Sequence, residues 1–325
     1  MSGQTKQVAL VVGASRGIGR QIALDLAKDG YAVVVAAKST SDASTTSPFP
    51  PDPNSPASTI STVTREIREG GGEATAIPVD TRDYASIQAL VSSTIATYGR
   101  LDVVVYNSGA IWWASVAKTP MSRFQLMQRV NVEGLYGVVQ ACLPHFQPKP
   151  NDPNQSSSKE NPAEYKGRII VISPPIYSRF FRGKTAYAIG KIGMSVLTVG
   201  LSMDFIREGK SNMAVTSLWP ATAIQSAATQ NLARDDAKDL RTAHIFSDAV
   251  REIIKAPAED VNGRLLLDED FLRERGKTEF DGYSLVKGTT PRRIMPMKFP
   301  DLRVEEQDDE GKRMDSTVLR AKAKL

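Results

Sequence analysis

The chain has 325 residues, of which 41 are basic and 36 acidic, so its net charge is +5. Hydrophobic residues make up 41% and charged residues 24%, values that exclude a wholly disordered, collagen-like or coiled-coil chain. The lone Cys142 excludes an intramolecular disulfide and a cysteine-cluster metal site. With only two histidines, a zinc site is unexpected, and we predict no metal.

The basic residues are scattered along the chain, so the charge predicts no nucleic-acid surface. Apolar runs stay shorter than about 18 residues, so we predict no membrane span. The first six residues lead directly into an apolar strand, which is not the pattern of a secretory signal.

Strands and helices alternate along the chain. Apolar runs predict buried parallel strands at residues 8–12, 31–37, 74–79, 101–106, 168–172, 213–219 and 263–268. Amphipathic stretches predict helices at residues 20–28, 59–69, 84–98, 121–146, 187–209 and 244–254. This alternation predicts one α/β domain over residues 1–290, a doubly wound parallel sheet of Rossmann type with helices on both faces.

Several polar segments depart from this alternation. Residues 39–58 and 148–163 are rich in Ser, Pro and Asn, which predicts insertion loops, and we expect the first to be mobile. Residues 224–242 predict a flap of helices over a cleft. Residues 291–325 form a charged, polar tail for which we expect partial disorder.

The first strand is followed by a glycine-rich turn, Gly13-Ala14-Ser15-Arg16-Gly17-Ile18-Gly19. Glycines let backbone N–H groups approach a diphosphate, and the N-terminus of the following helix adds partial positive charge. The turn lies between a buried strand and a helix, the context that such a site requires. It therefore predicts a dinucleotide site, with an ordinary strand–helix turn as the alternative.

Tyr187 and Lys191 are four residues apart in a predicted helix, so they share one face. A nearby ammonium favours the phenolate and lowers the pKa of a tyrosine from about 10 toward neutrality. Such a tyrosine can exchange a proton with a carbonyl or alcohol oxygen. The alternative is an exposed helical pair, but the position after the fifth strand favours the catalytic interpretation.

In chain order, these motifs resemble those of the short-chain dehydrogenase/reductase family. The matching motifs are the glycine turn, Asn107-Ser108-Gly109-Ala110, Asn131, the Tyr187/Lys191 pair and Pro220-Ala221-Thr222-Ala223. Further stretches resemble the hydroxysteroid dehydrogenase-like group of that family, over roughly residues 5–290. These stretches are Ala36-Ala37-Lys38, Ile172-Ser173-Pro174-Pro175, Leu218-Trp219-Pro220-Ala221-Thr222-Ala223-Ile224 and Leu267-Asp268-Glu269-Asp270. Animal members of the group carry a sterol-carrier domain, for which this chain is too short.

The resemblance implies a role for each catalytic residue. Tyr187 is the general acid/base, Lys191 lowers its pKa and holds the nicotinamide ribose, and Asn131 keeps a water for proton relay. The substrate-orienting serine of the family lies one residue closer to the tyrosine than Ser173, where this chain has Pro174.

We expect Ser173 to serve if the loop shifts by one residue, with Ser178 as the weaker candidate; the alternative is that Ser173 only ends its strand. An oxyanion donor can contribute about 3 kcal/mol, so this departure also admits an NADP(H)-binding sensor or scaffold with little turnover.

Charge predicts the choice of cofactor. An NAD-dependent enzyme places an acid after the second strand, whereas this chain has Ala37 and Lys38 there and Arg16 in the glycine turn. Two cations without an acid suit a 2′-phosphate and therefore NADP(H). Asp80 with Thr81 resembles the family's adenine contact, the alternative being a helix cap. The expected cofactor-binding residues are Gly13, Ser15, Arg16, Gly17, Ile18, Gly19, Lys38, Asp80, Thr81, Asn107, Ser108, Gly109, Tyr187, Lys191, Pro220 and Thr222.

Aromatic residues follow the turns that border the substrate cleft in this family. They are Trp112, Trp113, Phe180 and Phe181. They suggest an apolar or aromatic substrate, a carbonyl compound to be reduced or a secondary alcohol to be oxidised, although aromatic residues at such junctions can also be core.

The chain ends in Ala323-Lys324-Leu325, a variant of the S-K-L address. It predicts binding to the peroxisomal import receptor and a peroxisomal location, with a cytoplasmic protein as the alternative. The resemblance also implies a homodimer or homotetramer formed through the helices that carry Asn131 and Tyr187.

Overall fold

The computed structural model describes residues 6–146, 166–227, 229 and 237–305. The insertion predicted at residues 148–163 therefore lies outside the described residues. So do most of the central part of the predicted flap and the C-terminal tripeptide.

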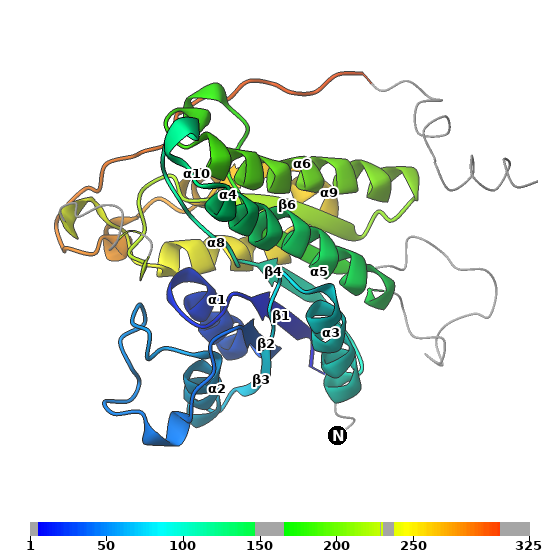
Figure 1. Cartoon of the computed structure of the whole chain (residues 1–325), viewed down its shortest axis with the longest axis vertical. Coiled ribbons are helices and arrows are strands. Elements are labelled where there is room, and N and C mark those ends of the chain that lie inside the picture. Colours follow the sequence, from blue (N-terminus) through cyan, green and yellow to red (C-terminus); the bar gives the residue numbers. More distant parts are fainter. Residues whose placement is uncertain (1–5, 147–165, 228, 230–236, 306–325) are drawn as a thin grey trace, which may run out of the picture.

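A seven-stranded sheet forms the centre of the molecule (Figure 1). Its strands, all paired in parallel, are β1 (Val8–Val12), β2 (Ala32–Ala37), β3 (Glu73–Pro78), β4 (Val103–Tyr106), β5 (Gly167–Ile172), β6 (Met213–Trp219) and β7 (Leu265–Leu267). Their order is β3-β2-β1-β4-β5-β6-β7. The predicted doubly wound, Rossmann-type α/β fold is confirmed, and the strand order reverses between β1 and β4.

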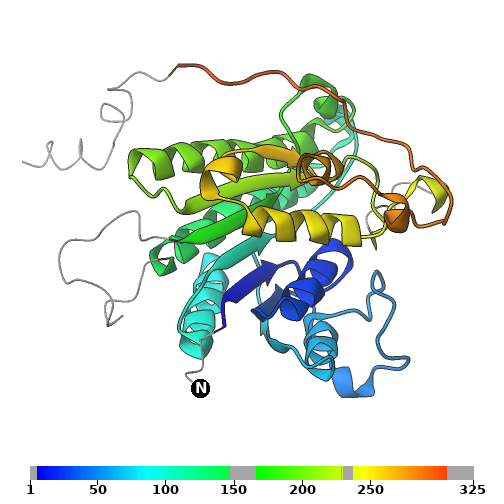
Figure 2. The same ribbon diagram turned by 180° about the vertical axis from the view of Figure 1, so that it is seen from behind.

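Helices cover both faces of this sheet (Figures 1 and 2). One core contains side chains of α1 (Gly17–Lys28), α2 (Ile60–Glu69) and α8 (His244–Lys255), and the other those of α3 (Tyr84–Tyr98), α5 (Gly134–Cys142) and α6 (Thr185–Arg207). Alternate residues of β1 enter opposite cores, Ala9 and Val11 the first and Leu10 the second. Burial on both faces explains why the strands are continuous apolar runs.

The helix predicted over residues 121–146 is not continuous. It consists of α4 (Met121–Gln128), a π-helical turn (Arg129–Glu133), α5 and a 3-10 turn (Leu143–His145). The Tyr106 hydroxyl donates to the carbonyl oxygen of Val130 at 2.5 Å, within the π-helical turn. Apolar periodicity did not reveal this interruption, and such turns often mark functional sites.

The insertion at residues 39–58, expected to be mobile, is instead anchored against the glycine turn. The Gly17 amide donates to the carbonyl oxygen of Pro53 at 2.9 Å, and the Ser58 hydroxyl donates to that of Ser15 at 2.7 Å. The segment lies beside α1 and α2 (Figures 1 and 2). Composition did not reveal these contacts because they are hydrogen bonds rather than an apolar face.

After α9 (Ala258–Val261), β7 and α10 (Asp268–Glu274), the chain returns across the carboxyl ends of β5 and β6. The amides of Ile294 and Met295 donate to the carbonyl oxygen of Ala221 at 2.9 and 3.1 Å. The Phe299 ring lies 5.4 Å from that of Tyr177. Residues 294–299 therefore contact the loops that follow these two strands.

Among the described residues, α6 is the helix whose length and apolar composition would suffice to cross a membrane. In this fold α6 packs against β5, β6 and α4, which accounts for its apolar composition. Its buried face carries Tyr187 and Lys191.

Candidate active site

The glycine turn leaves no room for side chains at two positions. A Cβ atom on Gly13, where φ is +89°, would lie 2.6 Å from the backbone nitrogen of Ser108. A Cβ atom on Gly19 would lie 2.2 Å from the carbonyl oxygen of Gly13. Only glycine permits these approaches, which bring the start of α1 against the end of β1. The turn thus fits the cradle that a diphosphate requires.

The turn that follows β4 is hydrogen-bonded to the glycine turn and to the end of β1. The Asn107 side chain donates from Nδ2 to the carbonyl oxygen of Gly13 at 2.9 Å, and the Asn107 amide donates to Val12 at 2.8 Å. Asn107 therefore positions the turn through hydrogen bonds. Ser108 lies directly against Gly13, so the expected residues of both turns are brought together.

Asn131 lies in the π-helical turn and is fully buried. Its Oδ1 accepts from the Ala110 amide at 2.8 Å and its Nδ2 donates to the Ala110 carbonyl at 3.1 Å. A Cβ atom on Gly109 would lie 3.4 Å from Nζ of Lys191 and 3.5 Å from Oδ1 of Asn131. The structure therefore gathers Gly109, Asn131 and Lys191, which are far apart in the sequence.

Gly190 is a residue of the site that the sequence analysis missed. A Cβ atom there would lie only 3.2 Å from Nδ2 of Asn131. Because Gly190 has no side chain, Asn131 can pack directly against α6 between Tyr187 and Lys191. Its signal was a glycine inside a long predicted helix, which often indicates close packing.

Tyr187 is 5% exposed, and its hydroxyl has no hydrogen-bond partner among the described residues. Burial raises the pKa of this phenol well above its usual value. Lys191 donates from Nζ to the carbonyl oxygen of Ile172 at 2.7 Å, and burial lowers its pKa to about 7.

The expected lowering of the tyrosine pKa is therefore wrong for this structure. The cost of burying the phenolate outweighs any stabilisation by Lys191, whose own charged form is disfavoured by the same burial.

Ser173 is fully buried at the end of β5, where its hydroxyl pairs with that of Ser217 at 2.8 Å. Ser217 also donates to the carbonyl oxygen of Ser173. No hydrogen bond joins Ser173 to Tyr187 within the described part of the chain. Ser178 is exposed in the short 3-10 helix Ser178–Phe181. A role for either serine in catalysis stays a prediction.

Directly after β2, Lys38 lies beside Asp80, with Nζ 3.3 Å from Oδ2. Asp80 also accepts from Nε of Arg82 at 2.8 Å, and this hydrogen bonding holds the pKa of the Asp80 carboxyl well below its usual range. Thr81 is buried next to Gly134. Arg16 is the N-cap residue of α1.

The loop that follows β6 begins at Pro220, and the buried hydroxyl of its Thr222 has no hydrogen-bond partner among the described residues. Thr222 is 2% exposed and forms an antiparallel bridge with Arg293. Ser226 approaches the turn instead, its Cβ lying 3.7 Å from the position of a Cβ on Gly17. The sequence analysis named Thr222 and did not name Ser226.

Asp268 positions the same loop and was missed as a functional residue. Its Oδ1 accepts from the Ala221 amide at 2.8 Å, and burial raises the pKa of its carboxyl to about 7. The sequence analysis quoted the stretch Leu267-Asp268-Glu269-Asp270 as part of the family resemblance. It assigned no role to Asp268, because the spacing of the stretch indicates none.

Aromatic rings lie beside Tyr187. The rings of Trp113 and Phe180 lie 6.3 and 6.1 Å from that of Tyr187, and Trp219 lies 5.9 Å from Phe180. Trp219 was not predicted. Trp112 instead lies under the guanidinium of Arg123, and Phe181 packs at the margin of the same cluster.

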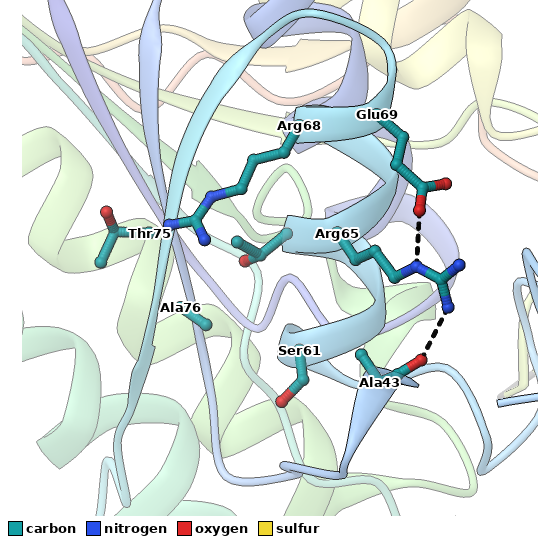
Figure 3. A pocket seen from close by; sticks show the side chains of 8 residues that line it. Ala43, Ser61, Arg65, Arg68, Glu69, Thr75 and Ala76 are labelled. Atoms are coloured by element: carbon teal, nitrogen blue, oxygen red, sulfur yellow. Dashed lines mark hydrogen bonds and ion pairs between the residues drawn. The ribbon is translucent and has the colours of Figure 1, made fainter. Parts of the chain in front are cut away.

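A cavity of about 610 Å³ lies elsewhere, between α2 and β3 at the edge of the sheet (Figure 3). Arg65 there donates to Glu69 at 2.7 Å and to the Ala43 carbonyl at 2.8 Å. None of the predicted site residues lines this cavity. The candidate site therefore remains at the carboxyl ends of the strands.

The family described as short chain dehydrogenase matches residues 7–48 and 54–237. This chain belongs to the short-chain dehydrogenase family. The members of the family are oxidoreductases that use nicotinamide cofactors.

Curated relatives of this short-chain dehydrogenase include hydroxysteroid dehydrogenase-like protein 2 of Danio rerio, 36% identical over 281 residues, and of Homo sapiens, 34% identical over 281 residues. Each alignment covers 86% of this chain and 60% of the relative, so the chain spans about three fifths of their length. The predicted resemblance to the hydroxysteroid dehydrogenase-like group is confirmed.

A solved structure of a putative dehydrogenase from Xanthomonas campestris is 32% identical, with a TM-score of 0.74. The alignment covers 93% of this chain and 100% of the solved chain. The fold of this short-chain dehydrogenase is therefore that of its solved relatives.

Proposed function

We propose that this chain is an NADP(H)-dependent oxidoreductase that reduces a carbonyl group, or oxidises a secondary alcohol, on an apolar or aromatic small molecule. The observation that carries the proposal is the convergence of Tyr187, Lys191 and Asn131 at the carboxyl edge of the sheet, next to a glycine turn with no room for a Cβ.

Residues of the turn would hold the cofactor's diphosphate against the start of α1, and Lys191 would hold the nicotinamide ribose. When bound, the reduced nicotinamide supplies a hydride to the carbonyl carbon. The Tyr187 hydroxyl gives its proton to the carbonyl oxygen, so an alcohol forms and the phenolate then takes a proton from solvent. Burial keeps Tyr187 protonated near neutral pH, the state required to donate.

Charge near the ends of β2 and β3 supports NADP(H). Lys38 and Arg82 lie beside a single acid, Asp80, which Arg82 already binds through hydrogen bonds, and Arg16 adds a further cation at the N-cap of α1. An excess of cations favours a 2′-phosphate over a 2′-hydroxyl.

The aromatic rings around Tyr187 support an apolar substrate. Phe180 is buried, whereas Trp113 is 47% exposed and so offers a face to a ligand. Apolar surfaces with one convergent polar group are typical of small-molecule sites.

Ser173 favours a second candidate, a NADP(H)-binding sensor or scaffold with little turnover. Its hydroxyl is bound to Ser217, and Pro174 occupies the position of the family's serine. Such a protein would bind the dinucleotide without reducing a carbonyl compound.

We also propose that the chain forms a homodimer or homotetramer and reaches the peroxisome. Large apolar side chains are exposed on α5 and α6, the helices that would pair; they are Tyr136, Ile189 and Val196. Binding of the import receptor would use Ala323-Lys324-Leu325, which lie outside the described residues.

The two candidate functions differ in turnover. We expect the purified chain to oxidise NADPH with a panel of apolar ketones, aldehydes or quinones, and Tyr187→Phe to lower kcat/KM by about 10²–10⁴-fold because the proton donor is lost. NADPH affinity, measured by fluorescence, should change by less than about threefold.

The matched control is Tyr177→Phe. In the wild type, the Tyr177 hydroxyl contacts Sδ of Met295 at 3.4 Å. It should retain activity. Equal activity of the wild type and Tyr187→Phe would disprove the mechanism, and NADPH binding without turnover on the panel would favour the sensor.

A further inference from the structure

The insertion at residues 39–58 reaches the N-terminus of α1. Besides the bonds to Ser15 and Gly17, the Asn54 amide donates to Oδ1 of Asp52 at 2.7 Å, which fixes the backbone at Asn54. The loop is thus held in one position against the glycine turn.

The Asn54 side chain is 7% exposed, and its Oδ1 is buried without a hydrogen-bond partner. Oδ1 lies 3.4 Å from the position that a Cβ on Gly17 would occupy, so the amide is directed at the first residue of α1. Ser226 approaches the same position from the loop after β6. Three separate segments therefore meet at Gly17.

The helix N-terminus at this point still has unused donors. The Gly17 amide is bound by Pro53 and that of Arg20 by the Arg16 carbonyl. In the described part of the chain, the amides of Ile18 and Gly19 have no acceptor. Free amides at a helix N-terminus favour an anion, and a buried amide side chain without a partner costs free energy until a ligand binds it.

We propose that Asn54 is a further dinucleotide-binding residue, which donates from its side-chain amide to the diphosphate of the cofactor. The inference rests on the proposed nicotinamide cofactor but not on the choice between its two forms. A half-turn of the amide exchanges Oδ1 and Nδ2, and directs a donor toward the acceptor-only diphosphate.

This position separates Asn54 from the residues that select the cofactor. Arg16 and Lys38 are assigned to the 2′-phosphate, which only NADP(H) carries, whereas both dinucleotides carry the diphosphate. Loss of the Asn54 donor must therefore weaken NADPH and NADH by the same factor.

The test is the isosteric Asn54→Asp, with the Kd of NADPH and of NADH measured by fluorescence and the Tm measured without ligand. We expect both Kd values to rise at least tenfold and by the same factor, since a carboxylate repels the diphosphate. The Tm should stay level or rise, because a negative charge at the N-terminus of α1 is favourable without a ligand.

Two matched variants isolate the effect. Ser55→Asp places the same charge one residue away and should raise either Kd by less than threefold. Lys38→Asp should weaken NADPH and not NADH, so that only the ratio of affinities changes. If Asn54→Asp does not fold, Asn54→Ser replaces it, with both Kd values expected to rise at least threefold.

Wild-type-like Kd values in a folded Asn54→Asp, or equal weakening by Ser55→Asp, would overturn the inference alone. Weakening of NADPH only would move Asn54 to the 2′-phosphate and also overturn it. A wild-type chain that binds neither dinucleotide would overturn the proposed function along with the inference.

Discussion

The two halves of the candidate site are built differently. In the dinucleotide half, defined by the glycine turn and the turn at Asn107, backbone atoms approach so closely that one added carbon would overlap. In the substrate half, defined by Trp113, Phe180, Trp219 and Tyr187, aromatic rings from four segments meet at centroid distances near 6 Å.

The difference indicates which atoms each half uses to recognise its ligand. A backbone cradle recognises a diphosphate that is common to many enzymes, and depends on few side chains. A cluster of rings can change shape with each substitution, so the substrate half can vary while the fold and the cofactor stay the same.

The largest effect is expected when the dinucleotide half is overfilled. Gly19→Ala would place a Cβ 2.2 Å from the carbonyl oxygen of Gly13, so the turn must move. We expect NADPH affinity to fall by at least about 100-fold, measured by fluorescence titration. The Tm should fall by at least about 3 °C in thermal denaturation.

Gly200→Ala is the matched control, because no atom lies within 4 Å of a Cβ at this position in α6. Alanine in a helix is more favourable than glycine, so the Tm should stay level or rise. Wild-type NADPH affinity in Gly19→Ala would show that the cradle is less rigid than the comparison requires.

A smaller effect is expected in the substrate half. Trp113→Ala removes a ring next to Tyr187 that is 47% exposed. We expect KM for apolar carbonyl substrates to rise about tenfold, because apolar contact is lost, with kcat changed by less than about threefold. Steady-state kinetics at saturating NADPH measures both.

Trp112→Ala is the comparison, since this neighbouring ring contacts Arg123 rather than Tyr187. Its KM should change less than that of Trp113→Ala. An equal change in the two variants would show that the substrate half extends beyond the ring cluster.

The smallest effect concerns Lys191, which joins the two halves. Burial lowers its pKa to about 7 in the folded chain, against about 10.4 when unfolded. Below pH 7 both states hold the proton, so the full cost of the buried charge is present. Between these values only the unfolded state holds it, and folding stability rises with pH.

Lys191→Met lacks this titration, so its Tm relative to the wild type should be at least about 2 °C higher at pH 6 than at pH 9. Thermal denaturation without ligand at both pH values measures the difference. A pH-independent difference would mean that Lys191 stays charged, or stays neutral, throughout this range.

Local patterns in the sequence predicted much of the dinucleotide half. Alternating apolar runs indicated the parallel sheet, and a glycine turn between strand and helix indicated the phosphate site. Tyr187 and Lys191 were found because an interval of four residues sets one face of a helix. For the glycine turn and the helical pair, the pattern and its structural consequence lie within a few residues.

The tertiary structure alone determined the contacts between segments that are distant in the sequence. The docking of Asn54 on Gly17, the approach of Ser226 rather than Thr222, and the pairing of Ser173 with Ser217 join residues 37 or more positions apart. The pKa of Tyr187 also depends on burial, which spacing does not contain. The sequence determined which groups are available, and packing determined which of them meet, because distance and desolvation are properties of the folded chain.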